Sequence, residues 1–358
     1  MLLKKMPLPA TLTPFLRRIF ISAALLPTCA WGDFTGSDSL ESPNDQWSYL
    51  HSGGGTFVSQ NSRLEFIVTS PASTNDATLL WVANQGAYDR NWYLQVDTNL
   101  ALVPLTEGNA ISLSLFAGNS SDHTNRQIVG IYSQRFQLNG LYHPTIVGYT
   151  DWGFFGETKS TARAVTLRLH FDSKEKTITG SWNAGNGWKY LIPQSITRWG
   201  MGNSDKFYAF LFAANGGTVT DDLLVASGSA RFTNFKTGAA KPQIAVEQPF
   251  KTNLVDGKDK RDFGSASVGI GKVKKTFTIR NNGTADLKGF KITNNGANPA
   301  DFVVAAPTTT TVPPGGSTTF TVTFKPKAIG VRNTTVHISS NDAAVPSFDI
   351  KLSGLGGK

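Results

Sequence analysis

The sequence predicts an all-β protein built of two β-sandwiches in series. Apolar and polar residues alternate with a period of two in several stretches, such as "ISLSL" (111–115) and "VTLRLHF" (165–171). This alternation places apolar side chains on one face of a strand. The 35 Gly and 17 Pro indicate many turns, and no stretch beyond the N-terminal region keeps helical periodicity for more than two turns. A chain of 358 residues suits two domains.

Residues 1–32 are predicted to be a secretory signal peptide. Four basic residues precede the short apolar run "IFISAALL", and "PTCAWGD" follows it with cleavage expected after Gly32. An uncleaved anchor is the alternative, although the apolar run is shorter than the roughly 20 residues that span a bilayer. No transmembrane segment is expected in the mature chain. We therefore expect a secreted protein, extracellular or associated with the cell surface, with the periplasm as an alternative.

Cys29 is the only cysteine, and it lies within the predicted signal peptide. The mature chain would then have none, which excludes thiol catalysis and zinc sites with cysteine ligands. Secreted domains of this size are large enough to fold around their own cores without disulfides.

Charge is distributed unevenly along the chain. Residues 33–240 hold 14 basic and 17 acidic side chains, a net charge of −3, whereas residues 241–358 hold 16 basic and 8 acidic ones, a net charge of +8. The basic part would attract an anionic glycan or membrane surface, or it is simply a solvated face. It contains no Trp or Tyr to stack on bases, so nucleic acid is not an expected partner.

Composition changes at "KTGAAKPQIAV" (236–246), which predicts a first domain at 33–237, a linker at 238–242 and a second domain at 243–358. The first domain begins with "DFTG" and ends near "RFTNF", and between them "LRLHFDSKEKTITGSW" contains a strand, a turn and a second strand. This order resembles the concanavalin A-like jelly roll of legume lectins, laminin G-like domains and some glucanases. The resemblance implies that the first and last strands lie side by side.

The second domain carries "DFG" (262–264), "FTIRNNGTADL" (277–287), "PGGSTTFTVTFKP" (314–326) and "SSND" (339–342). These motifs resemble the repeat of bacterial choice-of-anchor D proteins, which is related to Hydin-type immunoglobulin-like domains. The resemblance implies a seven-stranded β-sandwich without a disulfide. The family name implies an anchoring segment, but the sequence ends at "LSGLGGK", so release or attachment by association is expected.

The strands of the second domain can be read from its alternation. Apolar residues expected to face inward are Phe277, Ile279, Phe320, Val322, Phe324, Val336, Ile338, Phe348, Ile350 and Leu352. Within "KKTFTIRNNGTADLKGFKI" (274–292), the residues Asn282 and Gly283 are expected to form the turn of a strand pair.

No catalytic constellation is recognisable in the sequence. Glucanases of jelly-roll fold place carboxylates as E-x-D-x-E on one strand, and that spacing is absent. The five histidines are scattered, without zinc-ligand spacing. The protein is therefore expected not to be an enzyme.

A ligand site is expected where aromatic residues stand among glycines. The stretches "VGYTDWGFFGET" (147–158) and "SWNAGNGWKYL" (181–191) supply the candidate ligand-binding residues Tyr149, Asp151, Trp152, Phe155 and Trp188. Aromatic planes stack on sugar rings while polar side chains bond the hydroxyls. Core packing is the alternative for these residues, and it is favoured for Trp182.

No cofactor is required, but Ca²⁺ is a candidate ligand because loop carboxylates and carbonyls hold it in related folds. Asp151, Asp221 and Asp222 are the candidate metal ligands, with solvated loop acids as the alternative reading.

The functional hypothesis is a secreted non-catalytic binding protein. Its jelly roll would bind a polysaccharide, a cell-surface glycan or another surface ligand, and its immunoglobulin-like domain would serve as a spacer. The alternatives are a structural or adhesive cell-surface protein with protein partners only, or a polysaccharide-cleaving enzyme.

Overall fold

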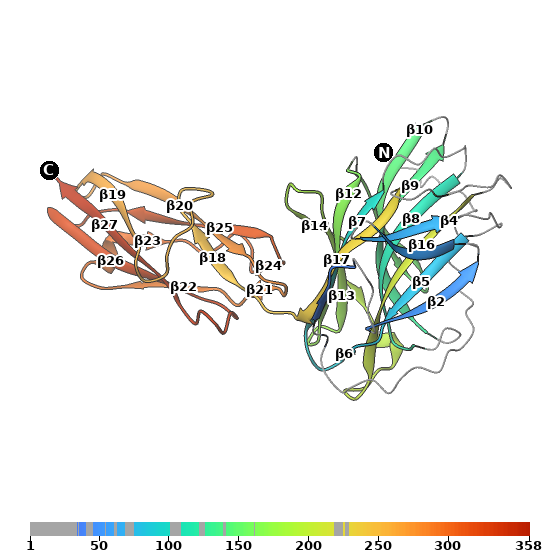
Figure 1. Cartoon of the computed structure of the whole chain (residues 1–358). Coiled ribbons are helices and arrows are strands. Elements are labelled where there is room, and N and C mark those ends of the chain that lie inside the picture. The colour runs from blue at the N-terminus through green and yellow to red at the C-terminus, as the bar shows by residue number, and fades with distance from the viewer. Residues whose placement is uncertain are drawn as a thin grey trace, which may run out of the picture. The chain divides into compact units, whose positions relative to one another are not determined.

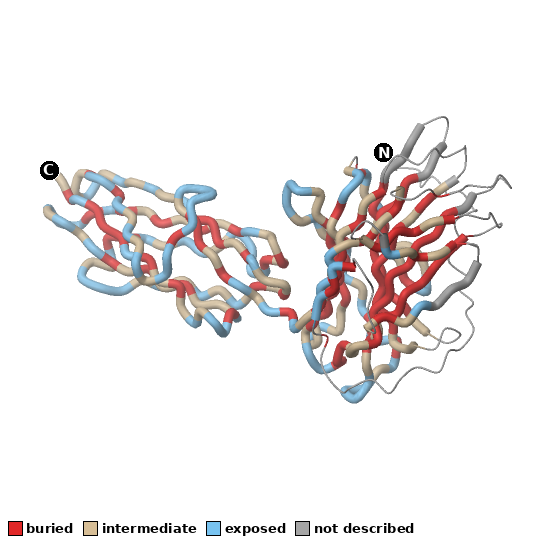
Figure 2. Tube along the Cα trace, in the orientation of Figure 1, coloured by how far each residue is buried: buried red, intermediate tan, exposed pale blue. Residues whose placement is uncertain are grey.

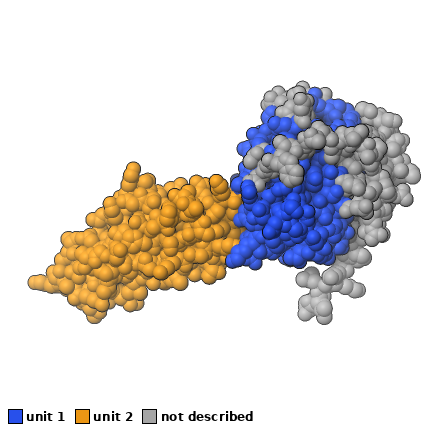
Figure 3. Space-filling view, turned by 90° about the horizontal axis from the view of Figure 1, so that it is seen from below, with its two compact units in different colours: residues 1–239 blue, residues 240–358 orange. Residues whose placement is uncertain are grey.

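The computed structural model describes residues 34, 36–40, 46–53, 55–60, 63–68, 75–100, 109–121, 126–138, 141–160, 162–217, 225 and 229–358. The chain forms two compact units, residues 1–239 and 240–358 (Figure 3). The predicted signal peptide and Cys29 lie outside the described residues. In the part that is described, no helix has the length and apolar character needed to cross a membrane.

The described part of the first unit contains two large sheets (Figure 1). One follows the order β14-β13-β12-β7-β17-β4-β3, with β1 beside β17 and β15 beside β13. Its strands are β1 (Gly36–Asp38), β3 (Gly55–Gln60), β4 (Arg63–Val68), β7 (Trp92–Leu100), β12 (Ala164–Asp172), β13 (Thr177–Asn183), β14 (Trp188–Tyr190), β15 (Gln194–Ser195) and β17 (Ala230–Ala239). We call this the nine-stranded sheet.

The other, eight-stranded sheet follows the order β11-β10-β9-β8-β16-β5-β2, with β6 beside β16. Its strands are β2 (Trp47–Gly53), β5 (Asn75–Trp81), β6 (Gly86–Ala87), β8 (Asn109–Gly118), β9 (Ile128–Leu138), β10 (Leu141–Thr150), β11 (Gly153–Lys159) and β16 (Lys206–Gly217).

The core of the first unit lies between these sheets, as the period-two pattern predicts. Along β7 and β12 the inward residues are buried, and residues of both sheets share one apolar cluster (Figure 2). Trp182 is only 2% exposed within this cluster, which confirms its predicted place in the core. The eight-stranded sheet also carries a smaller apolar cluster on its other face, around Phe116, Phe210 and Phe212.

The two ends of the first unit meet in one sheet. β1 pairs antiparallel with β17, so that Gly36 lies opposite Thr237 and Asp38 opposite Phe235. The predicted neighbourhood of the first and last strands is therefore confirmed. The pairing holds because Phe235 is fully buried and Asp38 accepts a hydrogen bond from the Trp47 indole at 2.9 Å.

The second unit is a sandwich of two four-stranded sheets with an additional two-stranded ribbon, where the family resemblance implied seven strands. The first sheet contains β18 (Ile244–Glu247), β20 (Val273–Asn281), β25 (Ser317–Phe324) and β23 (Phe302–Val304). The second contains β19 (Lys260–Ser267), β27 (Phe348–Gly357), β26 (Gly330–Ser339) and β22 (Lys291–Asn295). The ribbon pairs β21 (Leu287–Lys288) with β24 (Thr311–Val312), and a short 3₁₀ helix, η2 (Pro299–Asp301), precedes β23.

All ten residues predicted to face inward in the second unit are buried, and they form a single apolar cluster. Phe277 and Phe320 lie opposite each other on β20 and β25, with their rings stacked at 5.1 Å. Alternation alone therefore identified this core.

The predicted turn at Asn282 and Gly283 does not join a strand pair, and this prediction was wrong. β20 pairs with β18 and β25, whereas β21 pairs with β24 and β22 with β26. The chain crosses to other strands because the buried side chain of Asn281 donates to the Ala285 carbonyl in the crossing segment and to the Val312 carbonyl of β24. Gly283 also lies so close to residue 241 that a Cβ atom would collide with the backbone there.

The segment predicted as a linker is partly strand. Residues 238 and 239 pair with β7 at the end of β17, and β18 begins at Ile244. Residues 240–243 therefore connect the last strand of one unit to the first strand of the next.

Candidate functional site

The candidate site lies at the hairpin between β10 and β11. Thr150 pairs with Gly153, which leaves Asp151 and Trp152 as the two turn residues, both exposed. The Thr150 hydroxyl donates to the Gly153 carbonyl at 2.9 Å, and the Asp151 amide donates to the Ile128 carbonyl of β9 at 3.2 Å. Gly153 has φ = +133°, a conformation that a side chain would oppose. The backbone thus fixes both side chains at the tip.

Arg198 completes the site from a distant part of the sequence. It belongs to a 3₁₀ helix, η1 (Thr197–Trp199), between the buried residues Ile196 and Trp199. These two anchors direct Arg198 outward, and its Cζ atom lies 3.2 Å from the centre of the Trp152 ring. Such contacts between a guanidinium and an indole are attractive. Sequence reasoning missed Arg198, because the search followed aromatic residues and Arg198 stands 46 positions after Trp152 in the sequence.

The three side chains offer complementary chemistry in one place. Burial raises the pKa of Asp151, while backbone hydrogen bonds at Asp151 and Ile128 and, less, the nearby charge of Arg198 lower it in part. Trp152 remains 36% exposed although Arg198 lies over its ring. An ionised carboxylate accepts hydrogen bonds, a guanidinium donates them, and the indole offers an apolar plane.

Tyr149 and Phe155 lie next to this hairpin but face opposite ways. The Tyr149 ring meets Phe154 edge-on at 5.5 Å, and it packs beside the cluster around Phe116 on the outer face of the eight-stranded sheet. Phe155 packs against the main core, and a Cβ atom on Gly148 would come within 2.5 Å of its ring. Tyr149 therefore borders the site, while the place of Phe155 favours a packing role.

Trp188 lies apart from the other candidates. It pairs with Asn183 at one end of β13, whereas Ser195, just before η1, pairs with Thr177 at the other end. Thr177 and Asn183 are six residue steps apart along the strand, which corresponds to roughly 20 Å. Trp188 and the Asp151 hairpin therefore do not line one pocket.

Trp188 has its own arginine. The Cζ atom of Arg168 lies 3.7 Å from the centre of the Trp188 ring, and Arg168 donates two hydrogen bonds to the Gln95 side chain at 3.0 and 2.7 Å. Burial lowers the pKa of Arg168 to about 10.

The calcium prediction is not tested by these residues. Asp151 is at the hairpin tip, but Asp221 and Asp222 lie outside the described residues. Among the residues whose placement is described, no group of three or more His, Cys, Asp or Glu side chains could hold a metal ion.

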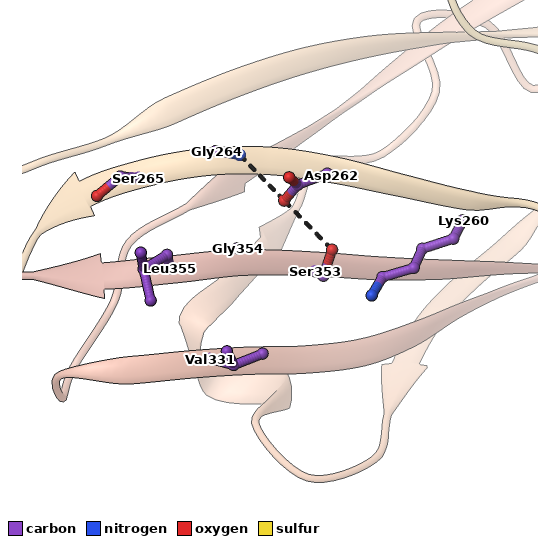
Figure 4. A pocket seen from close by; sticks show the side chains of 8 residues that line it. All are labelled: Lys260, Asp262, Gly264, Ser265, Val331, Ser353, Gly354 and Leu355. Atoms are coloured by element: carbon purple, nitrogen blue, oxygen red, sulfur yellow. Dashed lines mark hydrogen bonds between the residues drawn. The ribbon is translucent and has the colours of Figure 1, made fainter.

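The second unit has a shallow groove of about 360 Å³ on the outer face of its β19-containing sheet (Figure 4). Asp262 lies in its middle and accepts hydrogen bonds from the Gly264 amide and the Ser353 hydroxyl. Val331 and Leu355, which lie opposite each other on β26 and β27, form its apolar end.

Residues 254–355 match the family model described as "HYDIN/CFA65/VesB-like, Ig-like domain". This match agrees with the family resemblance of the second domain and with the observed sandwich. No match is found among curated proteins.

Several solved lectins are similar to the first unit. Lectin II from Ulex europaeus is 10% identical, with 57% of this chain and 98% of the lectin covered and a TM-score of 0.41. The Lotus tetragonolobus seed lectin is 13% identical, with 58% and 100% covered and a TM-score of 0.39. The lectin from Bauhinia forficata in complex with GalNAc is 10% identical, with 57% and 99% covered and a TM-score of 0.38. All three TM-scores lie below 0.5, so the strand pairing of the first unit itself establishes its sandwich.

Proposed function

We propose that the protein is a non-catalytic glycan-binding protein whose first unit binds a saccharide at Asp151, Trp152 and Arg198. The observation that carries this proposal is the exposed indole of Trp152 at a hairpin tip, with the guanidinium of Arg198 over its ring and the carboxylate of Asp151 on the preceding residue. Ligand sites for small polar molecules combine an aromatic or apolar surface with a few oriented polar groups.

The chemistry of the three side chains suits a sugar ring. The apolar C–H face of a pyranose would stack on the indole of Trp152, which is rigid and therefore loses little conformational entropy on binding. Asp151 would accept hydrogen bonds from sugar hydroxyls, and Arg198 would donate to ring or hydroxyl oxygens. The second unit would act as a spacer.

We further infer that the protein is exported. This inference rests on the basic, apolar and small-residue order of residues 1–32. The expected place of action is the cell surface or the extracellular space, with the periplasm as the alternative.

Retention of the full chain on immobilised polysaccharides tests the proposed site. We expect Trp152→Ala to weaken binding about tenfold, because stacking contributes about 1.4 kcal/mol or more. Trp188→Ala is the matched control, since it removes another arginine-covered tryptophan far from the hairpin. Equal retention of both variants and the wild type would rule out Trp152 as part of a glycan site.

The same preparations test the catalytic and calcium alternatives. Incubation with the bound polysaccharide is expected to release no reducing sugar. Repeating the retention assay with added Ca²⁺ and with a chelator shows whether a metal ion takes part; a loss of binding in chelator would favour the loop carboxylates as ligands.

The adhesive alternative receives less support from the sheet edges of the second unit. The edge strands β18, β23 and β22 have only four, three and five residues. The remaining edge strand, β19, shifts register between Asp262 and Ser265, where Gly264 has φ = +72°. Short and bulged edges disfavour strand addition by another chain.

A further inference from the structure

One end of the second unit brings three chain segments together, which we call the tip: residues 267–272, 325–331 and 355–358. The Gly269 amide donates to the Pro326 carbonyl at 3.2 Å, and the Val268 amide donates to the Gly357 carbonyl at 3.0 Å. A Cβ atom on Gly356 would collide with the carbonyl of Ala328, so the second and third segments are also in close contact. The tip is therefore one continuous surface.

The tip exposes four large aliphatic side chains. Ile270 is 88% exposed, Ile329 64%, Val331 65% and Leu355 46%. Val331 and Leu355 lie side by side at the apolar end of the groove (Figure 4), while Ile270 and Ile329 stand in the connecting loops. Single exposed aliphatic residues are common on proteins, but several gathered at one end mark an interaction surface.

Lysines are interspersed with these aliphatic residues. The tip segments contain Lys272, Lys325, Lys327 and Lys358, all exposed, and contain no Asp or Glu. Residues 241–358 as a whole carry a net charge of +8. The tip is therefore both apolar and cationic.

The tip lies at the far end of the second unit from its connection to the first. Residues 240–243 lead into the unit beside Gly283, just beyond the C-terminal end of β20, whereas Ile270 precedes the N-terminal end of that strand. β20 has nine residues, which corresponds to roughly 30 Å. The connecting segment therefore does not cover the tip.

We propose that the tip docks on an anionic lipid bilayer. Aliphatic side chains enter the boundary between headgroups and acyl chains, and lysines beside them bind anionic headgroups. The tip fits a lipid surface because its aliphatic side chains supply hydrophobic insertion and its lysines supply electrostatic attraction. The positive charge of the lysines selects an anionic bilayer. Ile270 and Ile329, at the ends of two loops, are the residues that enter the bilayer. This binding is independent of glycan binding by the first unit.

Vesicle flotation of the full chain tests this proposal. We expect the wild type to float with vesicles that contain phosphatidylglycerol and not with phosphatidylcholine vesicles. The bound fraction should fall several-fold when salt is raised from about 0.1 M to about 1 M, because salt screens the lysines. Replacing Ile270→Ser and Ile329→Ser together should lower partitioning at least about tenfold.

Two matched variants keep the test specific. Val255→Ser with Val303→Ser removes two aliphatic side chains that are each 52% exposed and lie outside the tip segments, and it should leave partitioning unchanged. Lys325→Gln with Lys327→Gln should lower partitioning about tenfold, whereas Lys241→Gln with Lys291→Gln, of equal charge change, should have less effect because Lys241 lies at the other end of the unit, beside Gly283. Absence of wild-type flotation, or equal losses in tip and control variants, would overturn the proposal.

Discussion

Trp152 and Trp188 both have an arginine over the indole, yet they occupy opposite kinds of surroundings. Arg168, over Trp188, is buried on a strand of the nine-stranded sheet and binds Gln95. Arg198, over Trp152, is exposed on a 3₁₀ helix and contacts an exposed hairpin tip. The comparison teaches that a stacked Trp–Arg pair becomes a binding surface only where the fold leaves it accessible. The Arg168 pair instead covers the outer face of its sheet.

The largest predicted effect is a loss of stability in acid, and it comes from the buried surroundings of Arg168. His170 lies on β12 beside Arg168, and burial, with a smaller contribution from the Arg168 charge, lowers the pKa of His170 from 6.5 to about 4. The unfolded chain therefore takes up this proton at a higher pH than the folded chain. The stabilisation that comes from keeping His170 neutral is fully present above pH 6.5. It is lost as the pH falls toward 4, which lowers the free energy of unfolding by up to about 3 kcal/mol.

Urea unfolding followed by tryptophan fluorescence measures this effect in the first unit alone, because all eight Trp precede residue 200. The His170→Gln variant should lack this part of the pH dependence. If wild type and variant lost stability in parallel between pH 6.5 and 4, His170 would not be held neutral by the fold.

Removing each arginine sharpens the comparison. Arg168→Ala should lower the free energy of unfolding by about 2 kcal/mol. The substitution leaves Gln95 without its hydrogen-bond donor and removes the contacts that the Arg168 side chain makes, including the one with the Trp188 ring. Arg198→Ala should change it by less than about 0.5 kcal/mol, since the side chain is exposed. The same unfolding measurement compares them, and similar losses would contradict the distinction between a structural and an accessible pair.

The smallest difference is expected between the tryptophans themselves. Trp188→Ala should destabilise the first unit by about 1 kcal/mol and Trp152→Ala by about 0.5 kcal/mol, because the cation–π contact is stronger where it is partly desolvated. Glycan retention should show the reverse order, with Trp152→Ala the weaker binder. A variant that lost both stability and binding to the same degree would indicate misfolding instead of a lost contact.

The strands were predictable because their signal is local. Alternation at 165–171 and 277–281 gave the buried faces of β12 and β20 without knowledge of any partner strand. Local alternation did not, however, predict which strands pair with β20. Asn282 and Gly283 have hairpin chemistry, but the buried amide of Asn281 and the close approach of residue 241 direct the chain elsewhere.

The candidate site shows the same division between what a local sequence pattern predicts and what long-range contacts decide. Aromatic residues beside glycines singled out Trp152 and Trp188 equally, because both lie in similar sequence surroundings. The distance between them along β13, and the arrival of Arg198 on Trp152, depend on contacts between residues far apart in the chain.

The sequence by itself determined the all-β class, the buried faces of the strands and the contrast in charge between the two units. These follow from side-chain alternation and composition, which each residue carries regardless of its neighbours in space. Only the tertiary structure decided how the strands after β20 pair, which tryptophan is accessible, and that four aliphatic residues and four lysines meet at one tip. These depend on long-range contacts, whose geometry no local pattern records.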